Sequence, residues 1–420
     1  MKGEQVNMFR EARVSGTEET WRAATLREAM VAELRELAAI RSTEVAEAFL
    51  AVPRHMFAPG EPLDSAYAAN KSVLSRQNAQ GVVVTTVSAA NIQAVMLEQA
   101  RLREGMRVLE IGSGGYNAAL IAELVGEAGE VTSVDIDPRV IARARGCLDA
   151  AGYGRVRTVV GDAEHGVADH APYDRVIVTA RAWDIAPAWV EQLARDGRIV
   201  LPLRLRGLTR SVVLDRVADE PGARFAGGDV RLCSFVPMQG AGAYQERVMA
   251  LDGGRVELRL DADLPCDPSR LGAALFGPTV QQWSGVEFDR PDLLEFWVAA
   301  NAPMSGILTA QQQPIDDGLV GPASALGVVT LLSRESFAYR MKRPILGTDR
   351  FETGVRAHGP NAGRLAEEYV DLLRRWRSSR RESSGGQPRL DVFPASTNDS
   401  DLPPGHVIDK VHTRVVISWP

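Results

Sequence analysis

Apolar positions between residues 107 and 236 form short unbroken runs that alternate with segments of helical spacing. The runs predict strands at 107–111, 131–135, 156–160, 174–179 and 198–202, and the intervening segments predict helices starting near Asn117, Pro138 and Pro187. Asp137 before Pro138 is a typical helix N-cap followed by a first-turn proline. Strands that alternate with helices in this way predict a doubly wound α/β sheet.

Two further β-rich runs, Ser211–Val217 and Asp229–Val236, follow the fifth strand without a convincing helix between them. They predict an antiparallel hairpin that closes the sheet, in place of a symmetric second Rossmann half.

The N-terminal region predicts one long helix, from Glu18 to about Leu50, with Thr17 as its N-cap. Its apolar residues recur every three or four positions and form one buried stripe: Leu26, Met30, Leu34 and Leu37. We expect residues 1–60 to form a helical segment that packs on a catalytic domain at 61–238.

The segment Gln239–Ala243 is rich in glycine and alanine and predicts a hinge. Beyond it, residues 240–420 predict an α+β domain that carries no chemical motif of its own. Its expected elements are strands at 255–260, 327–332 and 407–419, helices from near Pro291 and over 361–377, and a loop at 380–388. We found no internal repeat.

Composition limits the partners and the compartment. A formal net charge of −6 gives no reason to expect nucleic-acid or anionic-membrane binding. The three cysteines are scattered and predict reduced thiols, without a structural metal. Neither an apolar leader nor a run of roughly 18 apolar residues is present, so we expect a cytoplasmic protein. The sequence leaves the oligomeric state open.

The strongest chemical signal is the segment Glu110-Ile111-Gly112-Ser113-Gly114-Gly115-Tyr116-Asn117, which is followed by Val134-Asp135. A glycine loop after the first strand, with an acid ending the second, is where such sheets bind adenosine. The glycines admit close backbone approach, and the acid accepts from the ribose hydroxyls. With Glu110 just ahead of the first glycine, the loop resembles the S-adenosylmethionine-binding loop of class I methyltransferases more than the GxGxxG loop of nicotinamide enzymes.

Several segments in chain order resemble protein-L-isoaspartate (D-aspartate) O-methyltransferases. The most specific are Val52-Pro53-Arg54-His55-Met56-Phe57 and Thr86-Val87-Ser88, both ahead of the glycine loop. The other matching segments are Ala66-Tyr67, Gly161-Asp162, Tyr173–Ala180, Gly197–Pro202 and Phe235-Val236-Pro237. The resemblance covers about residues 40–238 and implies a class I methyltransferase fold with S-adenosyl-L-methionine as cofactor.

The resemblance also implies roles for single residues. Ser88 matches the active-site serine, which lies between cofactor and substrate carboxylate. Cofactor contacts fall on Thr86, Val87, Glu110, Gly112, Gly114, Gly115, Asn117, Asp135, Ile136, Asp162, Ala163 and Thr179. Substrate contacts fall on Thr86, Val87, Ser88, His165, Ala180 and Val236. No residue is assigned to a metal.

The implied reaction needs few catalytic side chains. A side-chain carboxylate with a pKa near 4 is already ionised at neutral pH, so no general base has to create the nucleophile. In-line positioning of this carboxylate against the methyl group supplies most of the acceleration. Ser88 is expected to orient a carboxylate oxygen by a hydrogen bond. The backbone amide nitrogen of the next residue then attacks the ester product, which releases methanol and gives a succinimide.

The chain also departs from the family pattern. The glycine loop is one residue shorter, Ala90 stands in place of the usual proline, and Ala69 replaces an acid. These changes fall where an isoaspartyl peptide would be recognised. Together with Trp183-Asp184-Ile185, the ending Val415–Pro420 and the second domain, they resemble methyltransferases of lanthipeptide gene clusters, which esterify an aspartate of a ribosomally made peptide.

Simpler interpretations compete at several of these positions. Ser88 is also a typical N-cap for a helix near Ala89. His165 and His170 are poorly spaced for a metal pair, whereas His165 is close enough to Asp162 to line a substrate mouth. Trp183 and Asp184 either touch substrate or start the next helix. The basic cluster Arg374, Arg375, Arg377, Arg380 and Arg381 either binds an acidic leader peptide or complements a helix C-terminus.

Two functions therefore lead. The first is a peptide-tailoring aspartate O-methyltransferase, whose partner is a modified precursor peptide with a leader. The alternative is an isoaspartyl repair methyltransferase with an appended domain. Nucleic-acid methylation lacks support, because the fourth strand ends in Val178-Thr179-Ala180 without the proline-rich motif of such enzymes. A scaffold with a vestigial pocket predicts loss of Ser88, Asp135 or Asp162, and all three are present.

Overall fold

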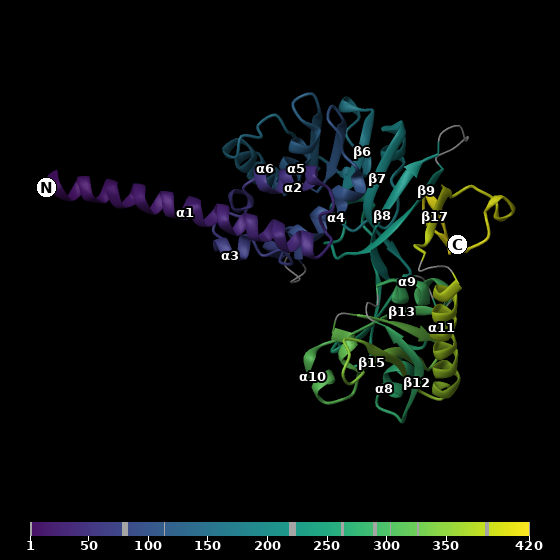
Figure 1. Ribbon diagram of the computed structural model, residues 1–420. Helices are drawn as coiled ribbons and strands as arrows, with labels where there is room; N and C mark the ends of the chain where they lie inside the picture. Colours follow the sequence, from purple (N-terminus) through teal and green to yellow (C-terminus); the bar gives the residue numbers. More distant parts are fainter. Residues whose placement is uncertain are drawn as a thin grey trace. The chain divides into compact units, whose positions relative to one another are not determined.

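The chain folds into two compact units (Figure 1). The computed structural model describes residues 2–77, 83–112, 114–217, 224–261, 264–288, 292–302, 304–325, 327–382 and 386–419. Unit 1 comprises Met1–Leu203, Ser211–Phe225 and Cys233–Ala243, and unit 2 comprises Arg204–Arg210, Ala226–Leu232 and Tyr244–Pro420. The chain thus passes between the units several times instead of crossing once near residue 239.

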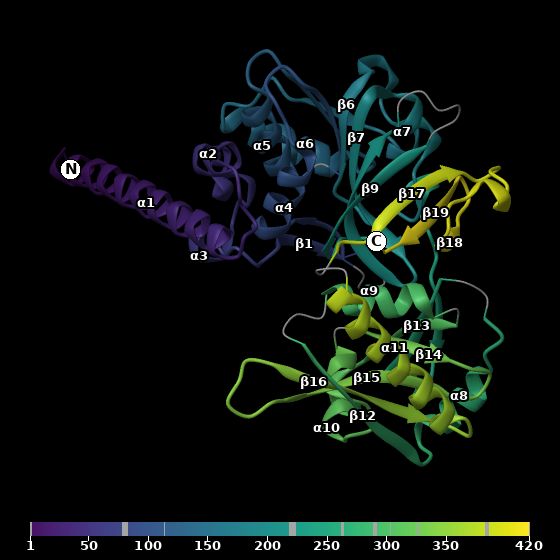
Figure 2. The ribbon, with the colours of Figure 1, turned by 45° about the vertical axis from the view of Figure 1, so that its right-hand side comes forward.

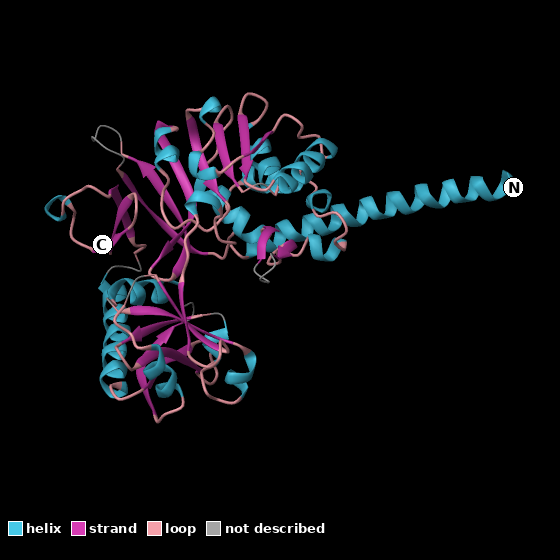
Figure 3. Ribbon diagram, turned by 180° about the vertical axis from the view of Figure 1, so that it is seen from behind, coloured by secondary structure: helices cyan, strands magenta, loops and turns pink. Residues whose placement is uncertain are grey.

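Unit 1 is built on a doubly wound sheet with the strand order β8-β7-β6-β3-β4-β5. The pairs β3–β4, β3–β6, β4–β5 and β6–β7 are all parallel. Helices α4, α5 and α6 pack against these strands (Figure 3). The strands of the predicted α/β sheet are therefore confirmed, and both strands of the expected closing hairpin are present as β8 and β9.

The helices of unit 1 are α1 (Lys2–Glu36), α2 (Thr43–Ala51), α3 (Leu63–Ala66), α4 (Ala90–Ala100), α5 (Tyr116–Val125), α6 (Pro138–Ala150) and α7 (Pro187–Glu191). Its 3₁₀ turns are η1 (Arg54–Phe57), η2 (Ala163–His165), η3 (Ala168–His170) and η4 (Gly240–Gly242). Its strands are β1 (Val73–Gln77), β2 (Val83–Val87), β3 (Arg107–Ile111), β4 (Glu130–Asp135), β5 (Arg157–Val160), β6 (Tyr173–Val178), β7 (Leu193–Leu205) and β8 (Leu208–Arg216). Strand β9 (Phe225–Leu232) starts four residues before its predicted position.

The prediction of one helix from Glu18 to Leu50, capped by Thr17, is wrong. Helix α1 already begins at Lys2, and the chain leaves it through Ala38, whose φ is +53°. A second helix, α2, then starts under the cap of Ser42. The Glu98 carboxylate on α4 accepts the Ser42 amide and hydroxyl at 2.8 Å each. A contact from a distant helix therefore fixes this break. Met30 and Leu34 are buried as expected, whereas Leu37 is 49% exposed.

Unit 2 is built on a seven-stranded antiparallel sheet in the order β10-β11-β13-β14-β15-β16-β12 (Figure 2). On one face the buried side chains of α9 and α11, including Trp297 and Tyr369, pack against Val329 and Val355. A separate core contains Leu271 of α8 together with Leu258 and Phe337. Because helices supply apolar side chains to both cores, the sheet is covered on two faces.

The helices of unit 2 are α8 (Pro268–Leu275), α9 (Asp292–Asn301), α10 (Gln312–Asp316) and α11 (Ala362–Glu382), with 3₁₀ turns η5 (Pro322–Ala325) and η6 (Asp399–Asp401). Its strands are β10 (Arg247–Ala250), β11 (Val256–Leu260), β12 (Thr279–Phe288), β13 (Ser305–Ala310), β14 (Val328–Leu332), β15 (Phe337–Pro344), β16 (Phe351–His358), β17 (Arg389–Pro394), β18 (His406–Asp409) and β19 (Thr413–Ser418).

The expected elements of the second domain are largely confirmed, with two corrections. Helix α11 continues to Glu382, into the predicted loop 380–388, of which 383–385 lie outside the described residues. The single strand predicted at 407–419 is two strands, β18 and β19, which pair with each other. The basic cluster on α11 is partly engaged: Arg374 and Arg377 donate to the Ser284 and Gly285 carbonyls, at a bulge of β12. These two contacts favour a structural role.

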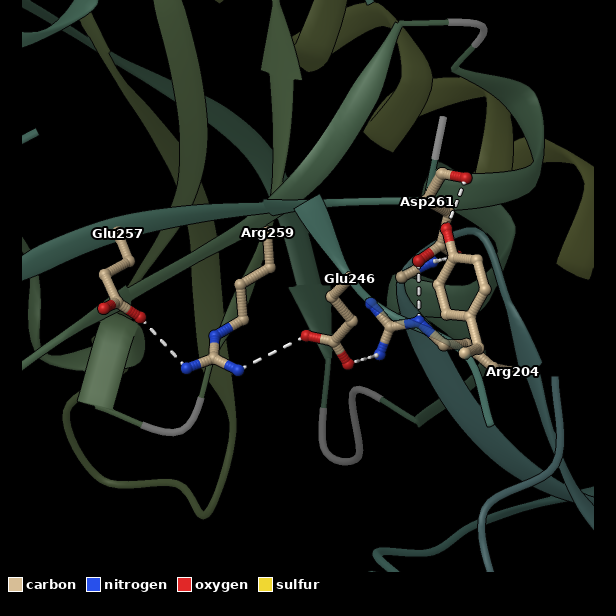
Figure 4. Close-up of polar contacts among 7 residues, drawn as sticks. Arg204, Glu246, Glu257, Arg259 and Asp261 are labelled. Atoms are coloured by element: carbon tan, nitrogen blue, oxygen red, sulfur yellow. Dashed lines mark hydrogen bonds and ion pairs between the residues drawn. The ribbon is translucent and has the colours of Figure 1, made fainter. Parts of the chain in front are cut away.

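A buried charge network holds the segment 204–207 within unit 2 (Figure 4). The Arg204 guanidinium, with a side chain only 5% exposed, pairs with Glu246 at 2.8 Å and Asp261 at 2.6 Å. Glu246 also pairs with Arg259 at 3.3 Å, and Arg259 with Glu257 at 3.0 Å. Asp261 further accepts the Gly207 amide, so one carboxylate binds both the side chain and the backbone of this segment.

Candidate functional site

A pocket opens at the carboxyl edge of the unit 1 sheet. The parallel register pairs Ile111 with Val134 and with Val178, so the residues that follow these three strands meet at one edge. The pocket is open to solvent and encloses about 770 Å³ of empty space, including its mouth. It is lined by Thr86, Val87, Ser88, Gln93, Ile111, Gly112, Gly114, Tyr116, Asn117, Val134, Asp135, Ile136, Ala163, Thr179, Ala180, Val236, Pro237, Met238 and Gln239.

The first glycine of the loop is fixed by the end of β6. Gly112 has a φ of +93°, a conformation that L side chains rarely adopt. The Thr179 hydroxyl donates to the carbonyls of Ile111 and Gly112, at 2.9 and 2.8 Å. A Cβ added at Gly112 would lie 2.6 Å from the Thr179 oxygen. The glycine therefore allows loop and strand to approach closely beneath the pocket.

Asp135 ends β4 on the pocket wall, beside Ile136. One oxygen of its carboxylate accepts the Asp137 backbone amide at 2.9 Å, and Asp137 in turn caps α6. This turn holds the Asp135 side chain at the edge of the sheet. Such a placement suits a carboxylate that accepts from ribose hydroxyls.

Glu110 lies behind the pocket and is not among its lining residues. It is fully buried, and it accepts the Asn117 side-chain amide at 2.9 Å and the Ser133 hydroxyl. Burial raises the pKa of Glu110 to about 7, against the lowering effect of these two hydrogen bonds. The assignment of Glu110 to direct cofactor contact is thus corrected: it supports Asn117, which does line the pocket.

Ser88 lines the pocket two residues before the start of α4. The N-cap of this helix is Ala89, which makes no side-chain capping bond, so the capping interpretation of Ser88 is wrong. Its carbonyl accepts from the Arg54 guanidinium at 2.7 Å. Arg54 is the arginine of the Val-Pro-Arg segment, is fully buried, and has its pKa lowered by that burial.

Asp162 does not line the pocket. It faces residues 236–243, a segment called the strap below. One of its carboxylate oxygens accepts the Glu164 amide at 3.0 Å, and the other accepts the Ala241 amide at 2.7 Å. The predicted hinge Gln239–Ala243 is therefore a 3₁₀ turn bound to Asp162. The strap is bound again at its start, where the Arg181 amide donates to the Val236 carbonyl at 2.8 Å and the Met238 amide donates to the Arg181 carbonyl at 3.1 Å. Four residues of the strap line the pocket: Val236, Pro237, Met238 and Gln239.

Two other predicted contacts are also placed away from the pocket lining. Gly115 caps α5 with a φ of +82°, and a Cβ there would lie 3.1 Å from Phe57. His165 is exposed, and its carbonyl accepts from Gln192 at 2.9 Å. Asp184, at the predicted rim, accepts the Ile185 amide and does not line the pocket.

Sequence reasoning missed seven lining residues: Gln93, Ile111, Tyr116, Val134, Pro237, Met238 and Gln239. Tyr116 follows the glycines directly, and Pro237 follows Val236, so proximity to assigned residues was a usable signal. Gln93 gave none, because its place in the pocket depends on how α4 packs.

Within the described residues, no group of three or more His, Cys, Asp or Glu side chains is arranged to hold a metal ion. In the same part of the chain, no helix combines the length and the apolar character needed to cross a membrane.

Comparison with known proteins identifies relatives of unit 1. The family described as protein-L-isoaspartate(D-aspartate) O-methyltransferase matches residues 25–242. The protein-L-isoaspartate O-methyltransferase of Methanopyrus kandleri is 40% identical over 223 residues, covering 52% of this chain and 94% of that protein. The second such enzyme of Archaeoglobus fulgidus is 42% identical over 163 residues, covering 39% of this chain and 71% of that protein.

Solved structures of the same kind are also similar. A protein-L-isoaspartate O-methyltransferase aligns with a TM-score of 0.49 and 21% identity, covering 94% of this chain and 99% of that one. A Plasmodium falciparum protein described in the same terms, in complex with S-adenosyl-L-homocysteine, aligns with a TM-score of 0.43 and 14% identity, covering 51% and 98%. With the family match over half of its length, the chain belongs to the protein-L-isoaspartate(D-aspartate) O-methyltransferase family.

Proposed function

We propose that this protein transfers a methyl group from S-adenosyl-L-methionine to the free carboxylate of an isoaspartyl residue in a peptide or protein. One observation carries the proposal. The family's serine segment, Thr86-Val87-Ser88, and the adenosine-type elements Gly112 and Asp135 line the same pocket, within the part of the chain that the family covers.

The pocket residues fit the cofactor. Gly112 and Gly114 give backbone access along one wall, and Asp135 offers a carboxylate at the sheet edge for the ribose. Ile136 and Ala163 line the pocket, and we expect them to flank the adenine. Asn117 is held in position by Glu110. Bound there, the cofactor supplies a sulfonium methyl group as the electrophile.

The protein's part in the reaction is to hold the acceptor. The carboxylate is ionised at neutral pH, so its oxygen needs orientation and not deprotonation. We expect Ser88, which lines the pocket, to donate a hydrogen bond to one carboxylate oxygen and so leave the other aligned with the methyl group. Thr179 and Ala180 line the same pocket, and we expect them to border the space between the two reactants. Alignment of two reactants can be worth several orders of magnitude in rate.

A second candidate is the tailoring of an aspartate in a ribosomally made peptide, with unit 2 recognising the peptide. It is supported by the changed substrate region. Ala69 and Ala90 stand where the family has an acid and a proline, and their neighbours join the two segments: the Asn91 amide donates to the Ala69 carbonyl at 3.0 Å, and its side chain donates to Asn70 at 2.7 Å. The names of the relatives favour the isoaspartyl acceptor. For either role we propose a cytoplasmic location, in accord with the scattered positions of Cys147, Cys233 and Cys266 along the chain.

Mass spectrometry with two matched peptides tests the proposal. An isoaspartyl peptide and its aspartyl twin are incubated with the protein and S-adenosyl-L-methionine. Gain of a methyl ester on the isoaspartyl peptide alone supports the first candidate. Methylation of a precursor peptide encoded beside the gene, with neither short peptide modified, supports the second. No methylation of any of them would refute both.

A further inference from the structure

Arg54 is a buried cation whose described contacts are all to neutral groups. Its side chain is fully buried. It donates to the Ala66 carbonyl at 2.8 Å, the Gln93 side-chain oxygen at 2.8 Å and the Ser88 carbonyl at 2.7 Å. Its guanidinium also lies 4.8 Å from the centre of the Tyr116 ring. No carboxylate pairs with it among the residues that the structure describes.

Burying the Arg54 guanidinium without a carboxylate partner costs free energy of folding. A buried charge is normally paired, because its desolvation is repaid only by an opposite charge and complete hydrogen bonding. Three of the four contacts of Arg54 are with residues that line the pocket: Ser88, Gln93 and Tyr116. The uncompensated positive charge therefore lies directly behind one pocket wall.

Arg54 also decides the orientation of the Gln93 amide. A guanidinium has donors and no acceptor, so the Gln93 atom that faces it at 2.8 Å must be the oxygen. The NH₂ group is then the other end of the amide. Gln93 is 4% exposed and lines the pocket one turn into α4, after Ser88. On the pocket wall, an NH₂ group turned in this way is a donor available to an acceptor of a bound ligand.

We propose that Arg54 is a positioning residue that turns the Gln93 amide toward the pocket, and that Gln93 binds a ligand carboxylate there. The inference rests on the proposed function, which offers two carboxylates: that of the cofactor's amino-acid part and that of the acceptor residue. Both are anions that gain from an N–H donor backed by a cation.

Ligand binding to the full-length protein tests this without any methyl transfer. Calorimetry gives dissociation constants for S-adenosyl-L-homocysteine and for 5′-methylthioadenosine, which has the same nucleoside thioether but no amino-acid carboxylate. Acetate, titrated into the S-adenosyl-L-homocysteine complex, reports the acceptor side. The main variant is Gln93→Glu, which keeps an oxygen toward Arg54 but presents a second oxygen in place of the donor. Gln93→Met removes both ends of the amide.

If Gln93 binds the cofactor carboxylate, both variants lower the affinity for S-adenosyl-L-homocysteine at least fivefold and leave the affinity for 5′-methylthioadenosine unchanged. If Gln93 binds the acceptor carboxylate, the affinity for S-adenosyl-L-homocysteine is unchanged in both variants and the affinity for acetate falls at least fivefold. Equal weakening of both nucleosides, or no change for any probe, would overturn the proposal. Gln99→Met is the matched control, since Gln99 lies buried on the same helix and outside the pocket, where it accepts from Ser211.

The role of Arg54 is tested by coupling. Arg54→Lys replaces the guanidinium, whose nitrogens donate to three separate acceptors, with a single ammonium group. We therefore expect a loss of affinity for the same probe that the Gln93 variants bind more weakly. In the double variant with Gln93→Met the two losses should not add, because one acts through the other. Fully additive losses would show that Arg54 does not work through Gln93. A wild-type protein that passes these tests but methylates no peptide would refute the proposed function and leave the carboxylate site standing.

Discussion

Thr179 and Gly112 are joined beneath the pocket, where the threonine hydroxyl donates to the glycine carbonyl at 2.8 Å. The pair connects the end of β6 to the loop after β3, two segments 67 residues apart in the chain. It leaves no room for a side chain at Gly112. The closeness of these two segments is what gives the pocket its floor.

We expect Gly112→Ala to lower S-adenosyl-L-methionine affinity at least tenfold. The added methyl group would lie 2.6 Å from the Thr179 oxygen, so the loop has to move away from β6. Calorimetric titration measures the effect. Gly105→Ala is the control: its φ of +80° imposes a similar backbone strain of about 1–2 kcal/mol, but nothing lies within 4 Å of the new methyl group. Equal binding by the two variants would contradict the steric argument.

Asp135→Ala should weaken S-adenosyl-L-methionine binding by about 1–3 kcal/mol, because the ribose hydroxyls lose a charged acceptor. Asp137→Ala is the control, because it should lower stability without lowering the affinity for S-adenosyl-L-methionine. It removes the α6 cap, at a cost of about 1 kcal/mol in stability, while its backbone amide still donates to Asp135. An unchanged dissociation constant in Asp135→Ala would sink the ribose assignment.

Ser88→Ala should lower methyl-transfer turnover at least tenfold with little change in cofactor affinity, since misplacing a nucleophile by about 1 Å is costly. The melting temperature should stay close to that of the wild type, because Ser88 does not cap α4. Steady-state kinetics beside thermal unfolding distinguishes the two roles. Normal turnover with a lowered melting temperature would return Ser88 to a structural role.

Glu110 should make folding stability fall as pH rises. Burial raises its pKa from 4.5 to about 7 in the folded chain, so the folded state holds the proton more tightly than the unfolded state. The resulting stabilisation is present below pH 4.5 and is lost as the pH passes about 7. Relative to Glu110→Gln, the wild type should lose on the order of 3 kcal/mol of unfolding free energy between pH 5 and 8. Denaturant unfolding of both proteins at several pH values measures this; parallel curves would disprove it.

Arg204→Met should destabilise unit 2 by about 3–5 kcal/mol, because Glu246 and Asp261 are left buried without this guanidinium. Arg259→Met provides the comparison. Its side chain is 41% exposed, so its pairs are screened by water and their loss should cost no more than about 1 kcal/mol. Denaturant unfolding that ranks the two variants equally would show that burial does not govern this network.

Local pattern predicted the α/β sheet, and the resemblance to a known family predicted most of the pocket. Apolar runs and the glycine loop report local backbone preferences, and parallel strands bring their carboxyl ends to one edge whatever lies between them. Twelve residues assigned from the sequence, from Thr86 to Val236, accordingly line the pocket: Thr86, Val87, Ser88, Gly112, Gly114, Asn117, Asp135, Ile136, Ala163, Thr179, Ala180 and Val236.

Tertiary packing decided the rest, because the deciding contacts join residues far apart in sequence. Glu98 ends the predicted N-terminal helix by binding Ser42, 56 residues away. Ala241 binds Asp162 across 79 residues and turns an expected hinge into a strap. Arg54 reaches Gln93 across 39 residues and orients an amide that no local pattern marks as functional. Periodicity reports which face of an element is buried, whereas the partner of a buried polar group is chosen only when distant elements meet.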